Sequence, residues 1–257
     1  VEKPLVIFMF GGGFIRGTRD DESYNGWFRT MTENGYRVIS IDYRLGLKGS
    51  NKVGIAQVNV LDKAIHMAVE DLFSATNFIL ENADQFGVSP DNIVISGSSA
   101  GAISVMQAEY EIANSTSWAS VLPEEFNYAG VMSFSGAILS REGKVDYKKV
   151  PCATLMLHGT SDELVPYNQI KVFNLGFFGG GKLVERFKKF GLNYNMYHFT
   201  GYGHEIAGSM GTTFDLQDKF LKTNVMQKKM RIVEAWIDDP NVYKGSGPQS
   251  RKELYGN

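Results

Sequence analysis

The sequence lacks most of the features that would place it outside the ordinary globular proteins. Its 257 residues include a single cysteine, Cys152, which excludes an internal disulfide. The formal net charge is −2 with scattered lysine and arginine, so nothing favours binding to nucleic acid or to an anionic membrane. No run approaches the 18 apolar residues of a membrane-spanning helix. No Cys/His set and no HExxH pattern occurs, so we expect neither a metal nor another cofactor.

The chain also has no internal repeat, low-complexity tract or Pro/Ser-rich linker, so we expect one domain over residues 1–257. Short apolar runs rich in β-formers recur along it, with helical patterns between them. The expected strands are 5–10, 36–42, 92–96, 129–133, 153–158 and 195–199, and the expected helices are about 58–85, 100–113, 168–174, 181–190 and 215–238. This alternation predicts a doubly wound, mostly parallel α/β sheet with helices on both faces.

The most informative motif is a G-x-S-x-G element, because residues 97–101 read Gly-Ser-Ser-Ala-Gly. A strand-like run at 93–95 leads into it and a helix-compatible stretch at 102–108 follows. In that context the pattern predicts a nucleophile elbow with Ser99 at its tip. The glycines two places before and after the serine would let strand and helix pass without collision. A Gly/Ser-rich turn without chemistry is the alternative.

A serine hydroxyl needs a base to remove its proton during attack. His204 lies in a Gly-rich loop after the last strand-like run, at the edge where open α/β sheets place functional groups. We therefore take it as the candidate base. The other histidines lie in a helix, at the end of a strand and within a strand, and we expect them to pack or to shape a turn; they are His66, His158 and His198.

The base in turn needs an acid to orient it. Asp162 follows the 153–158 run through a short turn, which also puts it at the carboxyl edge of the sheet. The chain order Ser99, Asp162, His204 is the one that accompanies the elbow on this fold. Two alternatives stay open: the adjacent Glu163 is the acid, or Asp162 only caps the following turn.

Donors for an oxyanion are expected after the first strand, where residues 10–14 read Phe-Gly-Gly-Gly-Phe. Backbone N–H groups of Gly12 and Gly13, with that of Ala100, could point at a carbonyl oxygen. A flexible turn and a phosphate-binding loop are the alternatives, although no G-x-G-x-x-G or Gly-Lys-Ser/Thr follows. Aromatic residues near these motifs are expected to line a substrate pocket or to pack in the core; they are Phe14, Trp27, Tyr43, Trp118 and Tyr202.

Further segments match the same family as these motifs. They are Asp-Tyr-Arg-Leu at 42–45, Ser-Pro-Asp-Asn-Ile at 89–93, His-Gly-Thr-Ser-Asp at 158–162 and Gly-His-Glu at 203–205. Over about residues 4–240 the chain resembles the α/β-hydrolase superfamily, and within it the compact carboxylesterases of the hormone-sensitive-lipase-like type. The Gly-Gly-Gly-Phe and Ser-Ala-Gly-Ala segments also resemble the larger type-B carboxylesterases. The helix near 181–190 with the late Gly-x-Gly-His-Glu is similar to bacterial esterases that remove feruloyl or acetyl groups from plant xylan.

The resemblance implies a serine ester hydrolase that works through an acyl-enzyme. Ser99 would be the nucleophile, Asp162 the acid and His204 the base, with the oxyanion on the amides of Gly12, Gly13 and Ala100. The substrate would be a small-molecule or carbohydrate-linked ester. Alternatives are a serine peptidase or other acyl hydrolase on this scaffold, and a non-catalytic esterase-like binding module.

The sequence departs from the family's pattern in a few places. Phe10 stands where lipase-like esterases usually have histidine, so the glycine loop must be steadied differently. The family's opening β-hairpin is expected upstream of Val1. We expect a trimmed or mature chain that once carried an export signal, hence a bacterial periplasmic or secreted protein, with a cytoplasmic location as the alternative. Residues 111–128 form either a small cap or an ordinary connection, and the polar tail 239–257 is expected on the surface.

Overall fold

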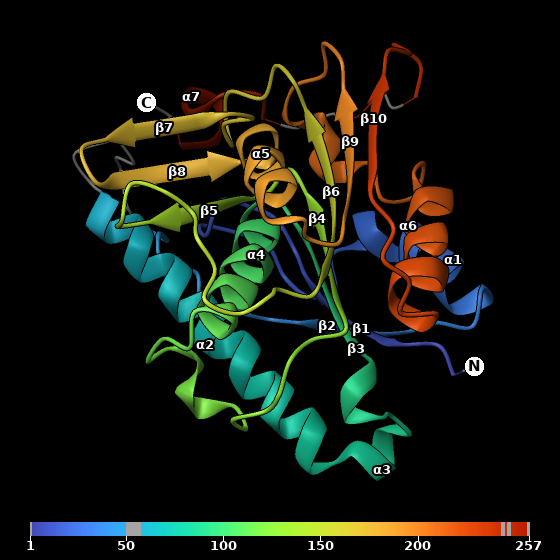
Figure 1. Ribbon diagram of the computed structural model, residues 1–257. Helices are drawn as coiled ribbons and strands as arrows, with labels where there is room; N and C mark the ends of the chain where they lie inside the picture. Colours follow the sequence, from blue (N-terminus) through green and yellow to red (C-terminus); the bar gives the residue numbers. More distant parts are fainter. Residues whose placement is uncertain (1, 50–57, 243–244, 246–247, 256–257) are drawn as a thin grey trace.

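The computed structural model describes residues 2–49, 58–242, 245 and 248–255, and its centre is a seven-stranded sheet (Figure 1). All neighbouring strands in this sheet are parallel, in the order β10-β9-β6-β4-β3-β1-β2. The strands are β1 (Leu5–Met9), β2 (Arg37–Ile41), β3 (Ile93–Ser98), β4 (Gly130–Phe134), β6 (Ala153–Gly159), β9 (Tyr194–Phe199) and β10 (Val233–Ile237). The six predicted strands are all present, and they lie side by side.

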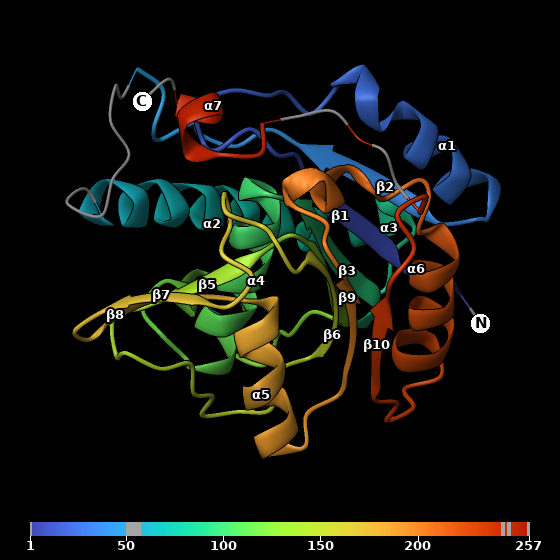
Figure 2. The same ribbon diagram turned by 90° about the horizontal axis from the view of Figure 1, so that it is seen from above.

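Helices cover both faces of the sheet. The α-helices are α1 (Asn25–Glu33), α2 (Val58–Glu81), α3 (Ala83–Phe86), α4 (Ala100–Ala113), α5 (Gly180–Phe190), α6 (Phe214–Phe220) and α7 (Arg251–Tyr255). Shorter helical turns are η1 (Glu22–Tyr24), η3 (Pro90–Asn92), η4 (Ala119–Val121), η5 (His204–Gly208) and the π-helical η6 (Leu221–Met226). Figure 2 shows α2, α4 and α5 on one face and α1 and α6 on the other. In the described part of the chain, no helix combines the length and apolar character needed to cross a bilayer.

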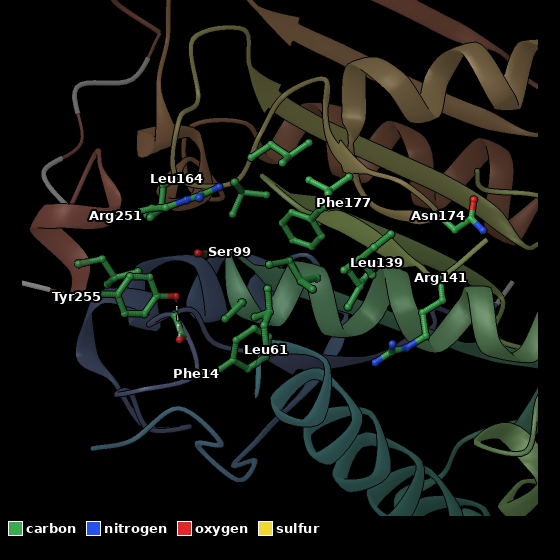
Figure 3. Close-up of a pocket in the computed structure, with 18 of the residues that line it drawn as sticks. Phe14, Leu61, Ser99, Leu139, Arg141, Leu164, Asn174, Phe177, Arg251 and Tyr255 are labelled. Carbon is green, nitrogen blue, oxygen red and sulfur yellow. Dashed lines mark hydrogen bonds between the residues drawn. The ribbon is translucent and has the colours of Figure 1, made fainter. Parts of the chain in front are cut away.

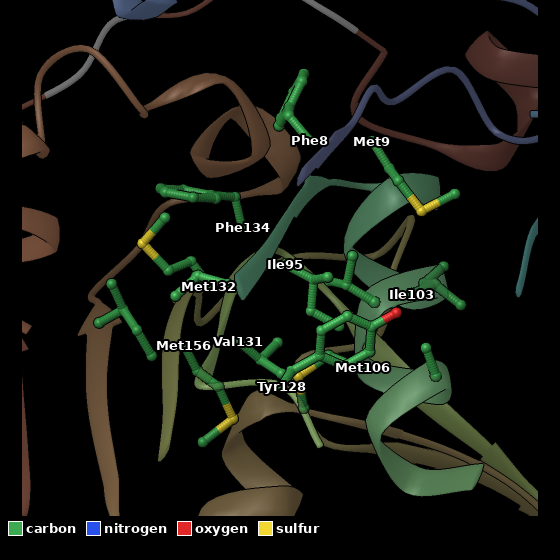
Figure 4. Packing of buried hydrophobic residues seen from close by; sticks show 14 of the residues in the cluster. Phe8, Met9, Ile95, Ile103, Met106, Tyr128, Val131, Met132, Phe134 and Met156 are labelled. Carbon is green, nitrogen blue, oxygen red and sulfur yellow. The ribbon is translucent and has the colours of Figure 1, made fainter. Parts of the chain in front are cut away.

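The strands are apolar throughout because each of their faces is covered. On β1, Phe8 faces α1, and its ring lies 5.0 Å from that of Trp27. Ile95 of β3 and Val131 of β4 instead lie on the face of the sheet that α4 covers (Figure 4). All of these side chains are buried, and so is every residue of α4 from Ala100 to Glu111. Helix α4, which begins directly after Ser99, is therefore anchored in the core.

A second, smaller sheet lies beside the first. Its antiparallel strands run in the order β5-β8-β7, with β5 (Ala137–Ser140), β7 (Gln169–Val172) and β8 (Leu175–Gly179). The predicted helix at 168–174 is therefore wrong. Polar and apolar residues alternate from Gln169 to Val172, which suits a strand, and Phe173 turns the chain with a positive φ of 52°.

The predicted single helix at 215–238 is also wrong. Helical structure ends at Met226, and the seventh strand, β10, follows. Lys228 has a positive φ of 50°, which a continuing right-handed helix does not allow. In β10 the residues Val233, Ala235 and Ile237 alternate with more exposed ones and pair in register with β9. The alternation of less and more exposed residues in β10 is the pattern of a strand, although the wider segment has the apolar spacing of a helix.

The two segments that broke the sequence pattern lie in different places. Residues 111–113 belong to the last turn of α4 and residues 114–128 follow it; the helix is about 20 Å long and has Ser99 at its other end. There Trp118 stacks on His66 of α2, with ring centroids 3.9 Å apart. In the described part of the tail most residues are exposed or half-buried, but Leu254 is only 8% exposed.

Candidate active site

Ser99 occupies a strained turn between β3 and α4. Its φ of 52° and ψ of −114° lie outside the regions that a serine favours. A Cβ on Gly97 would approach the Gly101 carbonyl to 2.3 Å, and a Cβ on Gly101 would approach the Met9 oxygen to 2.1 Å. Only glycine fits at both positions, so the G-x-S-x-G spacing is what permits this turn. The Ser99 amide donates to the Phe134 oxygen at 2.9 Å, which holds the turn against β4.

Ser99, His204 and Asp162 form one hydrogen-bonded chain. The Ser99 Oγ lies 2.8 Å from His204 Nε2, and His204 Nδ1 lies 2.8 Å from Asp162 Oδ2. The three residues follow β3, β9 and β6, whose carboxyl ends share one edge of the sheet. Because the aspartate accepts at Nδ1, the imidazole carries its proton there and Nε2 can accept the serine proton. An arrangement of this kind can activate a hydroxyl for attack on a carbonyl carbon.

The Asp162 carboxylate is held in place by more than the histidine. Its Oδ1 accepts hydrogen bonds from the amides of Leu164 at 3.0 Å and Val165 at 2.9 Å. Burial by itself would raise the pKa of Asp162, but hydrogen bonds from His158 and His204 outweigh it, and the pKa lies well below its usual range. Asp162 is therefore ionised at neutral pH. The adjacent Glu163 side chain, the rival acid, is exposed.

His158 contacts the same carboxylate and was not expected to. Its Nδ1 accepts from the Gly180 amide at 3.3 Å, so the ring proton is on Nε2. That Nε2 lies 3.1 Å from the Val165 oxygen and 3.3 Å from Asp162 Oδ2. The histidine of the His-Gly-x-x-Asp sequence thus donates toward the acid, which the strand position alone did not indicate.

The glycine loop after β1 lies against this chain. Gly12 and Gly13 have φ values of 114° and 65°, which only glycine adopts readily. The Gly11 amide donates to the Tyr24 hydroxyl at 3.1 Å. Within the described residues, no hydrogen bond of the protein uses the amides of Gly12, Gly13 or Ala100. These three amides are available to an oxyanion.

Phe10, which replaces the usual histidine, steadies the loop by packing. Its ring stacks on Tyr43 with centroids 4.5 Å apart, and the Tyr43 hydroxyl donates to the Phe10 oxygen at 2.8 Å. A Cβ on Gly17 would come within 2.5 Å of the Phe10 ring, so the loop closes tightly over it. The ring and the phenol take the place of a polar contact.

The expected pocket aromatics mostly lie elsewhere. Phe14 borders a cavity on one side of Ser99, and Trp27 lines a cleft on the other side. Tyr43 and Tyr202 are buried, and Tyr202 donates to the Asp239 oxygen at 2.8 Å. Trp118 lies at the far end of α4. In the described part of the chain, neither of the two hollows beside Ser99 is lined by Tyr43, Tyr202 or Trp118.

An apolar cavity of about 480 Å³ opens on one side of Ser99 (Figure 3). The inner face of the small sheet forms one wall, through Leu139, Ile170, Leu175 and Phe177. Phe14 and residues of α2 and α4 form other walls; those of the helices are Leu61, Ala100 and Ile103. Figure 3 shows Arg141 and Asn174 at the end far from Ser99. The lining of the cavity is mostly apolar, with Arg141 and Asn174 at the far end and Arg251 at the end near Ser99.

A larger cleft of about 790 Å³, whose lining is more polar than that of the apolar cavity and which we call the polar cleft, lies on the other side of Ser99. His204 lines this cleft but not the apolar cavity. Its polar lining includes Arg16, Asp21, Ser23, Thr30, Glu205, Thr212 and Gln249. The described residues contain no group of three or more His, Cys, Asp or Glu side chains that could hold a metal ion.

Sequence reasoning missed two sets of lining residues. The small sheet was overlooked because its alternation spans only four residues in β7. The polar composition around α7 suggests a surface tail, although Ser250 and Glu253 have the Ser-x-x-Glu spacing of a helix start. That spacing was the available signal.

Comparison with known proteins fits this geometry. Residues 1–138 match the BD-FAE family model. Gut esterase 1 of Caenorhabditis briggsae is 35% identical over 104 residues, which are 40% of this chain and 18% of that protein. Acetylcholinesterase of Gallus gallus is 33% identical over 104 residues, or 40% and 13%. The chain thus matches less than a fifth of these curated relatives.

Solved structures extend the likeness over most of the fold. The thermophilic esterase Est2 of Thermogutta terrifontis has a TM-score of 0.58 at 20% identity, covering 86% of this chain and 81% of that one. The same esterase phosphoramylated by tabun has a TM-score of 0.60, covering 86% and 83% at 20% identity. The chain therefore belongs to the BD-FAE family and has the α/β-hydrolase fold of these esterases.

Proposed function

We propose that this protein is a serine carboxylic-ester hydrolase that works through an acyl-enzyme intermediate. The observation that carries the proposal is the chain of two 2.8 Å hydrogen bonds from Ser99 through His204 to Asp162. This chain of hydrogen bonds lies beside the backbone amides of Gly12, Gly13 and Ala100, which donate to no other group in the described part of the protein. Family membership and the esterase relatives support the same reaction class.

In each step of the proposed ester hydrolysis, a named group of the protein transfers a proton, forms a bond or stabilises a charge. His204 Nε2 takes the hydroxyl proton as Ser99 Oγ bonds to the ester carbonyl carbon, and the amides of Gly12, Gly13 and Ala100 stabilise the oxyanion. Ionised Asp162 stabilises the imidazolium. The imidazolium then protonates the departing alkoxide as the ester C–O bond breaks. Water, deprotonated by the same histidine, attacks the acyl-enzyme and releases the acid and Ser99.

The two hollows beside Ser99 indicate where the alcohol half and the acyl half of the ester bind. His204 must reach the oxygen of the departing alcohol, so the alcohol lies on the side that His204 lines. That side is the polar cleft. The acyl group is left with the apolar cavity, which borders Ser99 and Ala100 but not His204.

Among the acetyl and feruloyl esters of plant polysaccharide, we favour the feruloyl ester. A cavity of about 480 Å³ is in the size range of pockets that bury drug-sized molecules, and an acetyl group would leave most of it empty. The Arg141 guanidinium, paired with Asp62 at 2.6 Å, and the Asn174 amide could hydrogen-bond ring substituents at the far end. The polar cleft suits a sugar hydroxyl as leaving group.

A panel of esters tests both parts of the proposal. Wild type and Ser99→Ala are assayed on p-nitrophenyl acetate, butyrate, octanoate and ferulate, which share one leaving group, and on a peptide p-nitroanilide. We expect turnover of the esters with a kcat/KM preference for the ferulate, none of the anilide, and no measurable turnover by a folded Ser99→Ala. Wild-type-like hydrolysis by that variant would end the proposal. A preference for acetyl would leave the reaction class intact and remove the feruloyl assignment.

A further inference from the structure

The C-terminal segment, residues 248–255, folds back onto the site (Figures 1 and 3). Its conformation is fixed locally. The Ser250 hydroxyl oxygen accepts from the Glu253 amide at 3.3 Å, and the Glu253 carboxylate accepts from the Gln249 amide at 2.7 Å. These paired bonds resemble a capping box and start α7. The segment therefore presents a defined surface to the rest of the protein.

One end of the segment holds the backbone of the histidine loop. The Gln249 Oε1 accepts a hydrogen bond from the His204 amide at 2.9 Å. A Cβ on Gly203 would lie 2.7 Å from that same oxygen, so the two chains are in close contact. The contact fixes the residue whose imidazole bonds Ser99.

The other end holds the glycine loop. A Cβ on Gly13 would lie 2.6 Å from Leu254 Cδ2, so the leucine packs directly on the glycine backbone. The Tyr255 hydroxyl donates to the Gly13 oxygen at 3.3 Å. Gly13, at a φ of 65°, has the widest conformational freedom of any residue type and depends on neighbours to stay in one conformation.

Leu254 also borders both hollows. It lines the apolar cavity and the polar cleft, as do Gly13, Leu164 and Ser99. The Leu254 side chain thus lies between the expected positions of the acyl group and the alcohol group of an ester bound at Ser99.

We infer that the C-terminal segment is a positioning element of the active site. It holds Gly13 and His204 in their reacting geometry, and Leu254 separates the acyl side from the alcohol side. These residues act through Gly13 and His204 rather than on the reacting atoms. The inference rests on the proposed esterase function.

The test measures kcat and KM separately for Leu254→Ala in the full chain. On p-nitrophenyl acetate, whose acyl group is too small to fill the cavity, we expect kcat to fall about tenfold or more with KM within about twofold, because the oxyanion donors are displaced. Leu254→Met, which restores contact, should recover kcat to within about threefold. Lys252→Ala, an exposed position of the same helix, is the matched control and should behave as wild type.

Gln249→Ala is the second variant, and thermal midpoints show whether each protein is folded. We expect Gln249→Ala to lower kcat on the acetate several-fold as well. The inference is overturned if folded Leu254→Ala and Gln249→Ala keep the wild-type kcat on the acetate, including the case in which only KM for methyl ferulate rises. Failure of the proposed function is a separate result, namely hydrolysis by Ser99→Ala.

Discussion

The hydrogen-bonded chain and the walls around it are built in different ways. Ser99, Asp162 and His204 follow three parallel strands of one sheet, and backbone hydrogen bonds to neighbouring strands fix where each loop begins. The apolar cavity is instead bordered along one wall by the small β5-β8-β7 sheet, which contacts the acyl side alone. The first region is part of the main sheet, and this wall belongs to a separate sheet beside it.

Because the two regions contact different parts of the ester, we expect the first to set the rate of ester hydrolysis and the second to set the selectivity between acyl groups. Groups that act on the ester carbonyl meet the same atoms in every substrate, so changes there should lower the turnover of all esters alike. Groups that contact the acyl chain meet different atoms in each ester, so changes there should alter the ratio between substrates. Substitutions in each region test whether rate and selectivity separate in this way.

Asp162→Asn should have the largest effect of the substitutions considered next. The asparagine oxygen can still accept from the Leu164 and Val165 amides, which leaves its NH₂ group facing His204 Nδ1. The imidazole would then carry its proton on Nε2 and could not accept one from Ser99. We expect kcat to fall about 10³–10⁴-fold, by the same factor on p-nitrophenyl acetate and methyl ferulate.

Glu163→Gln is the matched control for this substitution, because it changes the exposed neighbouring acid. It should leave both rates within about twofold of wild type. The assignment of the acid is refuted if Glu163→Gln is the slow variant and Asp162→Asn is not.

Ile170→Trp should change selectivity rather than chemistry. Ile170 lies on the face of β7 that lines the apolar cavity, so an indole there would take space from a large acyl group. We expect kcat/KM for methyl ferulate to fall at least about tenfold while the value for p-nitrophenyl acetate stays within about threefold. Lys171→Trp adds the same bulk on the exposed opposite face and should change neither. Equal losses on both esters from Ile170→Trp would break the proposed division.

Glu109 belongs to neither region and should affect stability alone. It lies in α4, fully buried, where its Oε1 accepts from the Cys152 amide at 2.7 Å. Burial raises its pKa from 4.5 to about 7, against the lowering effect of that hydrogen bond. Because the folded protein holds this proton more tightly than the unfolded chain, stability should decrease as the pH rises from about 4.5 through 7.

Glu109→Gln removes this titration while keeping the acceptor oxygen. The variant's free energy of unfolding, relative to wild type, should rise by about 3 kcal/mol between pH 5 and pH 9, at about 1.4 kcal/mol per pKa unit. Chemical denaturation at several pH values measures the difference, and kcat should not change. A relative stability that is flat with pH would show that Glu109 does not titrate as assigned.

The sequence predicted the region that follows the parallel strands. Six strands could be located from continuous apolar runs, and the loops after them contain Ser99, Asp162 and His204, which the structure brings within hydrogen-bond reach. This works because parallel strands place their carboxyl ends at one edge, so sequence order largely sets proximity. Their catalytic roles remain a proposal for the experiments above.

The walls could not be predicted because their contacts are long-range. Nothing local in Leu254 or Tyr255 shows that they pack on Gly13, which lies more than 240 residues away. The β7 strand has only four residues, too few for its alternation to outweigh a helical interpretation. For Tyr43 the sequence left a pocket position and a core position open, because only the packed structure shows that it is buried and supports Phe10.

Whether Ser99 is the nucleophile can be tested by labelling with a fluorophosphonate, followed by peptide mapping and an activity measurement on the same sample. We expect one label per chain, on Ser99, with loss of ester hydrolysis in proportion to the label, and no labelling of Ser99→Ala. Full ester hydrolysis by protein labelled at Ser99, or stoichiometric inactivation through a different residue, would contradict it.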